Sequence, residues 1–167
     1  MMELFEQLDR LVEKKTVHYG QLIDLLNEEW RHIGDSDLEK LEALLVRKEA
    51  LLITIHEINL QREQVVRAIG EQFEIDPVSL TLKEIIRLPG NTHRTRLQHF
   101  RRVLRSQIDT INRMNQTNRK LVRQSARTVK ESIDYLVEPA PQQFSPYNPK
   151  GDVADVPLEG RMVRTSA

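Results

Sequence analysis

The chain has 167 residues, the length of a single domain, and its formal net charge is zero. Charged residues make up 30 % and aromatic residues 5 % of the sequence, a balance typical of long amphipathic helices. Because cysteine is absent, disulfide frameworks and thiolate metal sites are excluded, and no apolar run reaches the ~18–20 residues of a membrane span, so we expect a cytoplasmic protein.

The first predicted element is a long helix over residues 3–33. Its apolar positions recur at steps of four and three residues, at Leu4, Leu8, Leu11, Leu22 and Leu25. Lys15 and His18 occupy positions on this same seam, where we expect weaker packing.

The connection to the next helix is short. Gly34 is suited to end the first helix as a left-handed cap. Ser36 and Glu39 then form a capping box, in which each side chain bonds the backbone amide of the other. So short a connection predicts an antiparallel hairpin.

The second predicted helix covers residues 37–73. Three ladders of residues seven apart run along it: Leu38, Leu45, Leu52; then Leu44, Leu51, Ile58, Val65; then Leu41, Lys48, Ile55, Arg62, Ile69. A face this wide predicts packing against at least two neighbours. We expect Lys48 and Arg62 to lie at its edge and to extend their charges into solvent.

A break and a short helix follow. Asp76-Pro77 interrupts the helical pattern, and Thr81 with Glu84 forms a second capping box that starts a short helix ending near Arg87. After a turn over residues 89–92, Asn91 or Thr92 is expected to cap the next helix.

The last predicted helix, residues 93–137, has polar residues in its apolar seam. Asn115 and Asn118 stand where apolar residues are expected, and Ser125 and Ser132 thin the seam further on. Asn is a poor helix former, and a polar residue in a seam lowers stability while fixing register or partner choice. The stretch from residue 114 onward is therefore expected to be marginal on its own and to pack better with a partner.

Charge is distributed unevenly. Residues 1–86 carry 18 acidic and 10 basic side chains, a net charge of −8, while residues 87–167 carry a net charge of +8. Within residues 87–130 there are twelve Lys and Arg, and Asp109 is the single acid. The favoured interpretation is that the basic helix lies against acidic ones; the alternative is a face for nucleic acid or an acidic partner.

Residues 139–167 hold five of the seven prolines and show no periodicity, so they are interpreted as a flexible tail after a helical core of residues 1–138. The segment 146–151 within the tail is either a turn or a short docking motif anchored by Tyr147. Sequence physics alone favours the turn.

The sequence gives no sign of catalysis. No glycine-rich phosphate loop is present, and the five histidines do not have metal-ligand spacing. We therefore expect a non-enzyme without metal or cofactor. The predicted fold is all-α: an elongated bundle of three long antiparallel helices, with one short connecting helix and the tail.

Three short motifs resemble those of the FlgN family, the flagellar type III export chaperones of hook-associated proteins. Lys48-Glu49-Ala50-Leu51-Leu52 with downstream Arg62 is similar to the family's Lys-x-x-Leu-Leu pattern. Asn115-Gln116-Thr117-Asn118 followed by Leu121-Val122 is similar to its Asn-x-x-Asn-x-x-Leu-Leu signature, with Val in place of the second Leu. Tyr147-Asn148-Pro149-Lys150-Gly151 resembles its Tyr-x-x-x-Gly tail motif. The three motifs occur in the family's order.

The resemblance implies a chaperone that binds the C-terminal helical segments of hook-filament junction proteins, prevents their premature assembly and delivers them to the export gate and its ATPase apparatus. It places client binding on the last long helix, where the candidate residues are Met114, Asn115, Asn118, Leu121, Val122, Val129 and Ile133. It places export-gate docking at Tyr147 and Gly151. Two alternatives remain: a basic-helix protein for nucleic acid or acidic partners, and a self-associating coiled-coil adaptor.

The seam residues of the last helix have a second interpretation, as ordinary core within the molecule. Both interpretations hold if the residues are core in the free chain and contact the client when it binds. The sequence does not predict the oligomeric state.

Overall fold

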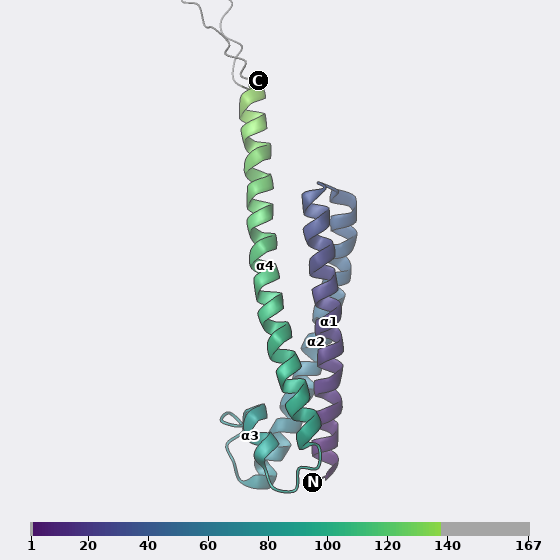
Figure 1. The fold of residues 1–167 in the computed structure, drawn as a ribbon, viewed down its shortest axis with the longest axis vertical. Coiled ribbons are helices and arrows are strands. Elements are labelled where there is room, and N and C mark those ends of the chain that lie inside the picture. The colour runs from purple at the N-terminus through teal and green to yellow at the C-terminus, as the bar shows by residue number, and fades with distance from the viewer. Residues whose placement is uncertain (1, 138–167) are drawn as a thin grey trace, which may run out of the picture. The chain divides into compact units, whose positions relative to one another are not determined.

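The computed structural model describes residues 2–137, and this part of the chain consists of helices without strands. Figure 1 shows α1 (Met2–Gly34), α2 (Leu38–Phe73), α3 (Leu82–Arg87) and α4 (Arg94–Val137). The expected all-α class is confirmed. Across residues 2–137, no helix combines the length and the apolar character needed to cross a bilayer.

The chain divides into two compact units, Met1–Arg127 and Thr128–Ala167. The first contains α1, α2, α3 and most of α4. The described part of the second is the end of α4. The predicted boundary between a core of residues 1–138 and a tail of residues 139–167 stays a prediction, since the tail lies outside the described residues.

The connection between α1 and α2 differs from the sequence prediction. Gly34 is still helical, and Ser36 takes the left-handed conformation with φ of 56°. The amide of Ser36 donates to the Ile33 carbonyl at 3.2 Å and that of Asp37 to the His32 carbonyl at 3.1 Å, the two bonds of a Schellman cap. Because Ser36 is occupied in ending α1, the expected box with Glu39 is wrong. Asp37 caps α2 instead and accepts from the Lys40 amide at 3.2 Å.

Two of the three ladders on α2 face the interior. Leu44, Ile58 and Ile55 are buried, whereas Leu38, Leu45 and Leu52 are exposed at 77 %, 47 % and 45 %. The ladder of Leu38, Leu45 and Leu52 therefore lies outside the buried face of α2. A helix buries a limited stripe against its neighbours, and here the apolar residues of α2 extend beyond that stripe.

One hydrophobic cluster joins the first half of α1, the end of α2, α3 and the start of α4. Its nine buried members are Phe5, Leu8, Val12, Val66, Ile69, Leu80, Ile85, Ile86 and Leu97. The short α3 contributes Ile85 and Ile86 to this cluster. It starts where predicted, because the Thr81–Glu84 capping box is present. The bond with Thr81 also holds the pKa of Glu84 below its ordinary value. This cluster anchors the beginning of α4 to α1.

A smaller cluster lies further along α1 and comprises Leu22, Leu26 and Ile55. Polar side chains occur between the two clusters. The Lys15 ammonium donates to Asn59 at 2.6 Å, and the Gln107 amide donates to the Thr16 carbonyl at 2.9 Å. Burial lowers the pKa of Lys15, with the nearby positive charge of Arg62 adding to the effect. The seam interruption predicted at Lys15 is therefore a partly buried polar layer.

Arg62 belongs to this layer as well. Its side chain is only partly exposed, and its Nε is buried without a hydrogen-bond partner among the described residues. The expectation that its charge would extend freely into solvent is therefore only partly right.

The entry to α4 is fixed by Asn91, which is buried. Its Oδ1 accepts from the His93 amide at 2.9 Å, and its Nδ2 donates to the Ile85 carbonyl at 3.0 Å. Asn91 was one of two residues expected to cap α4; in the structure its side chain instead orders the turn before the helix and ties that turn to α3.

Candidate functional site

Side-chain burial on α4 ends at Asn118. This residue is 5 % exposed, and no later residue up to 136 is buried. Its Nδ2 donates to the Leu26 carbonyl at 3.0 Å and to Glu29 Oε2 at 2.9 Å. The amide is thus satisfied within the first unit, where an unpaired one would cost about 1–3 kcal/mol.

Contacts between α1 and α4 occur at successive points along the two helices, in the same order on each. Arg96 Nε lies 2.9 Å from Asp9 Oδ2, Gln107 bonds the Thr16 carbonyl, and Asn118 bonds the Leu26 carbonyl. Each contact is a polar side chain of α4 directed at a specific atom of α1. A slide of one helix along the other would break all three, so they fix the register.

Glu29 joins two of the motifs noted in the sequence. Lys48 Nζ contacts Glu29 Oε1 at 2.9 Å and Oε2 at 2.8 Å, and Asn118 shares Oε2. The Lys48 and Glu29 side chains are only 18 % and 12 % exposed. The expectation that Lys48 would extend its charge into solvent is therefore wrong, because Glu29 provides a partner inside the bundle.

Sequence reasoning did not select Glu29. Its position carried a signal, since it lies seven residues after Leu22 and four after Leu25, on the apolar seam of α1. A carboxylate at such a position needs a buried partner, because burying an unpaired charge is costly. Lys48 and Asn118 supply it.

A cleft of about 360 Å3 opens beside this cluster. It is lined by Glu29, Lys48, Asn115, Asn118, Arg119, Val122 and Arg123. Its walls combine an exposed valine, 48 % accessible, with two arginines and the buried polar cluster. Such a mixture fits a partner that offers both apolar and acidic groups.

The remaining candidate residues differ in exposure. Met114 packs against the Leu22–Leu26–Ile55 cluster, and Leu121 is half-buried. In the second unit, Val129 and Ile133 are 59 % and 53 % exposed. Tyr147 and Gly151 lie outside the described residues.

The basic side chains of α4 are mostly not neutralised by the acidic helices. At the start of α4, Arg96 pairs with Asp9 and Glu13, and His93 just before the helix approaches Asp9 at 3.3 Å. The favoured interpretation, that the basic helix pairs with acidic ones, therefore holds at the start of α4.

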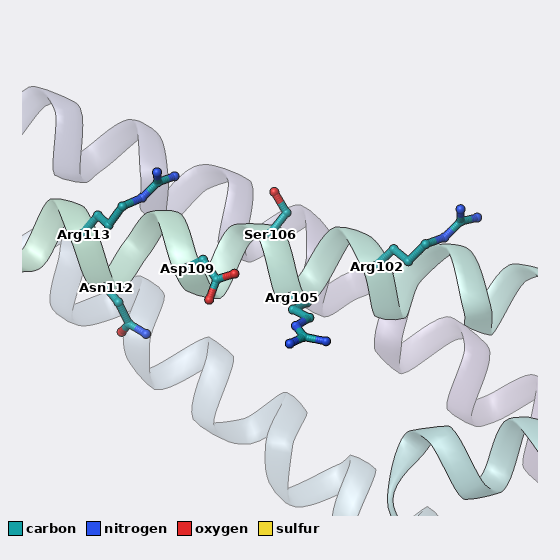
Figure 2. Close-up of a pocket in the computed structure, with 6 residues that line it drawn as sticks. All are labelled: Arg102, Arg105, Ser106, Asp109, Asn112 and Arg113. Carbon is teal, nitrogen blue, oxygen red and sulfur yellow. The ribbon is translucent and has the colours of Figure 1, made fainter.

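A depression of about 630 Å3 lies on this basic surface of α4. Figure 2 shows its six lining residues, which all belong to α4: Arg102, Arg105, Ser106, Asp109, Asn112 and Arg113. Within residues 2–137 no group of three or more His, Cys, Asp or Glu side chains is placed to hold a metal ion.

A family model described as FlgN protein matches residues 1–154. No curated protein and no solved structure matches the chain.

Proposed function

The chain belongs to the FlgN family of flagellar export chaperones, and we propose that it binds the C-terminal helical segments of hook-filament junction proteins in the cytoplasm. Binding would keep these segments from assembling early and would hold them for the type III export gate. Chaperones of this family act by binding flagellar proteins, not by catalysis.

The observation that supports this proposal is the exposed apolar side of α4 after Asn118. Val122, Val129, Ile133 and Leu136 recur at steps of seven, four and three, and they are 48 %, 59 %, 53 % and 80 % exposed. Apolar residues at this spacing form a continuous stripe on a helix. An amphipathic client helix can bury such a stripe in helix-to-helix packing.

The test uses two matched pairs of exposed apolar residues seven positions apart. Val122→Asp with Val129→Asp places two carboxylates on the proposed surface. Val46→Asp with Ile53→Asp makes the same change on α2, where the side chains are 65 % and 56 % exposed. Both double variants should stay folded, since no buried side chain changes.

We expect the α4 pair to weaken binding of a purified hook-filament junction protein by at least about 100-fold, because each carboxylate would be buried against apolar groups. The α2 pair should bind like the original chain. Calorimetry measures both. Unchanged affinity of the folded α4 variant would remove this surface as the client site.

We assign export-gate docking to Tyr147 and Gly151, on the resemblance of residues 147–151 to the family's tail motif. A chain that ends at residue 138 should bind the junction protein normally and lose its affinity for the cytoplasmic domain of the gate. Undiminished export of the junction protein in cells carrying that truncation would contradict the assignment.

A further inference from the structure

A stripe of basic side chains runs along the exposed side of α4. We define the basic stripe as Arg102, Arg105, Arg113, Arg119, Lys120 and Arg123. All six are exposed, and none forms an ion pair with another described residue. Their spacing keeps them on one side of the helix over roughly 32 Å.

The stripe is not required to hold the first unit together. The basic residues that have a structural role come earlier: Arg96 pairs with Asp9 and Glu13, and Arg94 donates to the Ile86 carbonyl at 3.0 Å. Six unpaired cations on one surface repel one another, which lowers stability slightly. A binding partner of opposite charge would relieve that repulsion.

The stripe leads into the cleft already described. Arg119 and Arg123 belong to both, and there they adjoin Val122, an exposed apolar side chain. A ligand that fills the cleft and continues along the stripe must carry apolar groups beside acidic ones. An amphipathic helix with Asp or Glu along one edge of its apolar face has this composition.

Nucleic acid fits the same surface less well. Residues 102–127 contain no aromatic side chain, so this stretch offers no aromatic platform for bases. Asp109 also lies within the stripe and lines the depression in Figure 2, where its carboxylate would repel a phosphate.

We propose that the basic stripe recognises acidic side chains on one edge of the client helix, and so selects clients by charge as well as by apolar contact. The inference rests on the proposed function and names the chemistry of the partner. Arg119 and Arg123 would contact the acids beside the cleft, and Arg102, Arg105 and Arg113 those of a longer client segment.

The experiment compares two double charge reversals in the full chain. Arg119→Glu with Arg123→Glu changes the stripe at the cleft, and Lys14→Glu with Lys83→Glu makes the same change in net charge at exposed positions of α1 and α3. Each is titrated with a purified hook-filament junction protein at about 0.05 M and about 0.3 M salt.

We expect the stripe variant to bind at least about tenfold more weakly at low salt, with the difference shrinking at high salt, and the control to bind like the original chain. Replacing acids of the client helix by lysine should restore binding to the stripe variant. Affinity within about twofold of the original would overturn the inference and leave the proposed function standing.

Two further outcomes would also overturn it. If the original chain binds no junction protein, the proposed function falls and the inference falls with it. The second outcome uses a 20-nucleotide single-stranded RNA. If the RNA binds the original chain but not the stripe variant, while the junction protein binds both chains equally, the stripe is a nucleic-acid-binding surface.

Discussion

Two helices, α1 and α2, end in a Schellman cap, and in each cap one residue has a left-handed backbone. Ser36 has φ of 56° and Glu74 has φ of 55°, and each ends a helix at a position where glycine carries no steric cost. Sequence rules pointed to Gly34 because it is the glycine nearest the end of α1. The glycine rule correctly predicted a left-handed cap but placed it at Gly34, two residues before Ser36. The backbone hydrogen bonds decide where the helix ends, and residue type alone does not fix that position.

The placement of this cap predicts the effect of two substitutions. Gly34→Ala should stabilise the fold by about 0.5–1 kcal/mol, because Gly34 is helical and an added Cβ meets nothing within 4 Å. Ser36→Gly should raise the free energy of unfolding by a similar amount, because glycine adopts the left-handed conformation without strain. Urea denaturation measures both. A loss of stability in Gly34→Ala would show that Gly34 is the left-handed residue after all.

At the scale of the element, α2 shows how far periodicity can predict burial. The seven-residue ladders identified the helix and its apolar positions, and most of the core positions at Leu44, Ile55, Ile58 and Ile69 follow from them. They could not show which ladder would be covered, because that depends on where α1 and α4 lie. The Lys48–Glu29 pair was missed for the same reason: it depends on the facing helix.

Two adjacent leucines on α2 test this burial pattern. Leu44→Ala should cost about 2–5 kcal/mol, since Leu44 is 1 % exposed and its loss leaves a cavity. Leu45→Ala removes the same atoms from a side chain 47 % exposed and should cost under about 1 kcal/mol. Denaturation midpoints give both values. Equal losses would indicate that the outer ladder is covered in solution by a second copy.

At the scale of the whole chain, the sequence correctly predicted that α4 changes character at its asparagines. Asn118 closes the buried part of the helix, and every described side chain from 126 to 136 is exposed. The sequence did not predict the bonding partners of the Asn118 side-chain amide, which are the Leu26 carbonyl of α1 and the Glu29 carboxylate. Those partners become visible only when the helices are placed side by side.

This change in burial predicts a gradient of amide hydrogen exchange along the chain. Residues 128–136 have no buried side chain, so their helix is held mainly by its own hydrogen bonds and should open often. Amides near Leu8 and Val12, at 0 % and 1 % exposure, should exchange close to the rate of global unfolding. Mass spectrometry should show exchange at least about 100-fold faster in the first group. Addition of the junction protein should slow that group and leave the second unchanged. Strong protection of residues 128–136 in the free chain would mean that this surface is already covered, and would contradict its availability to a client.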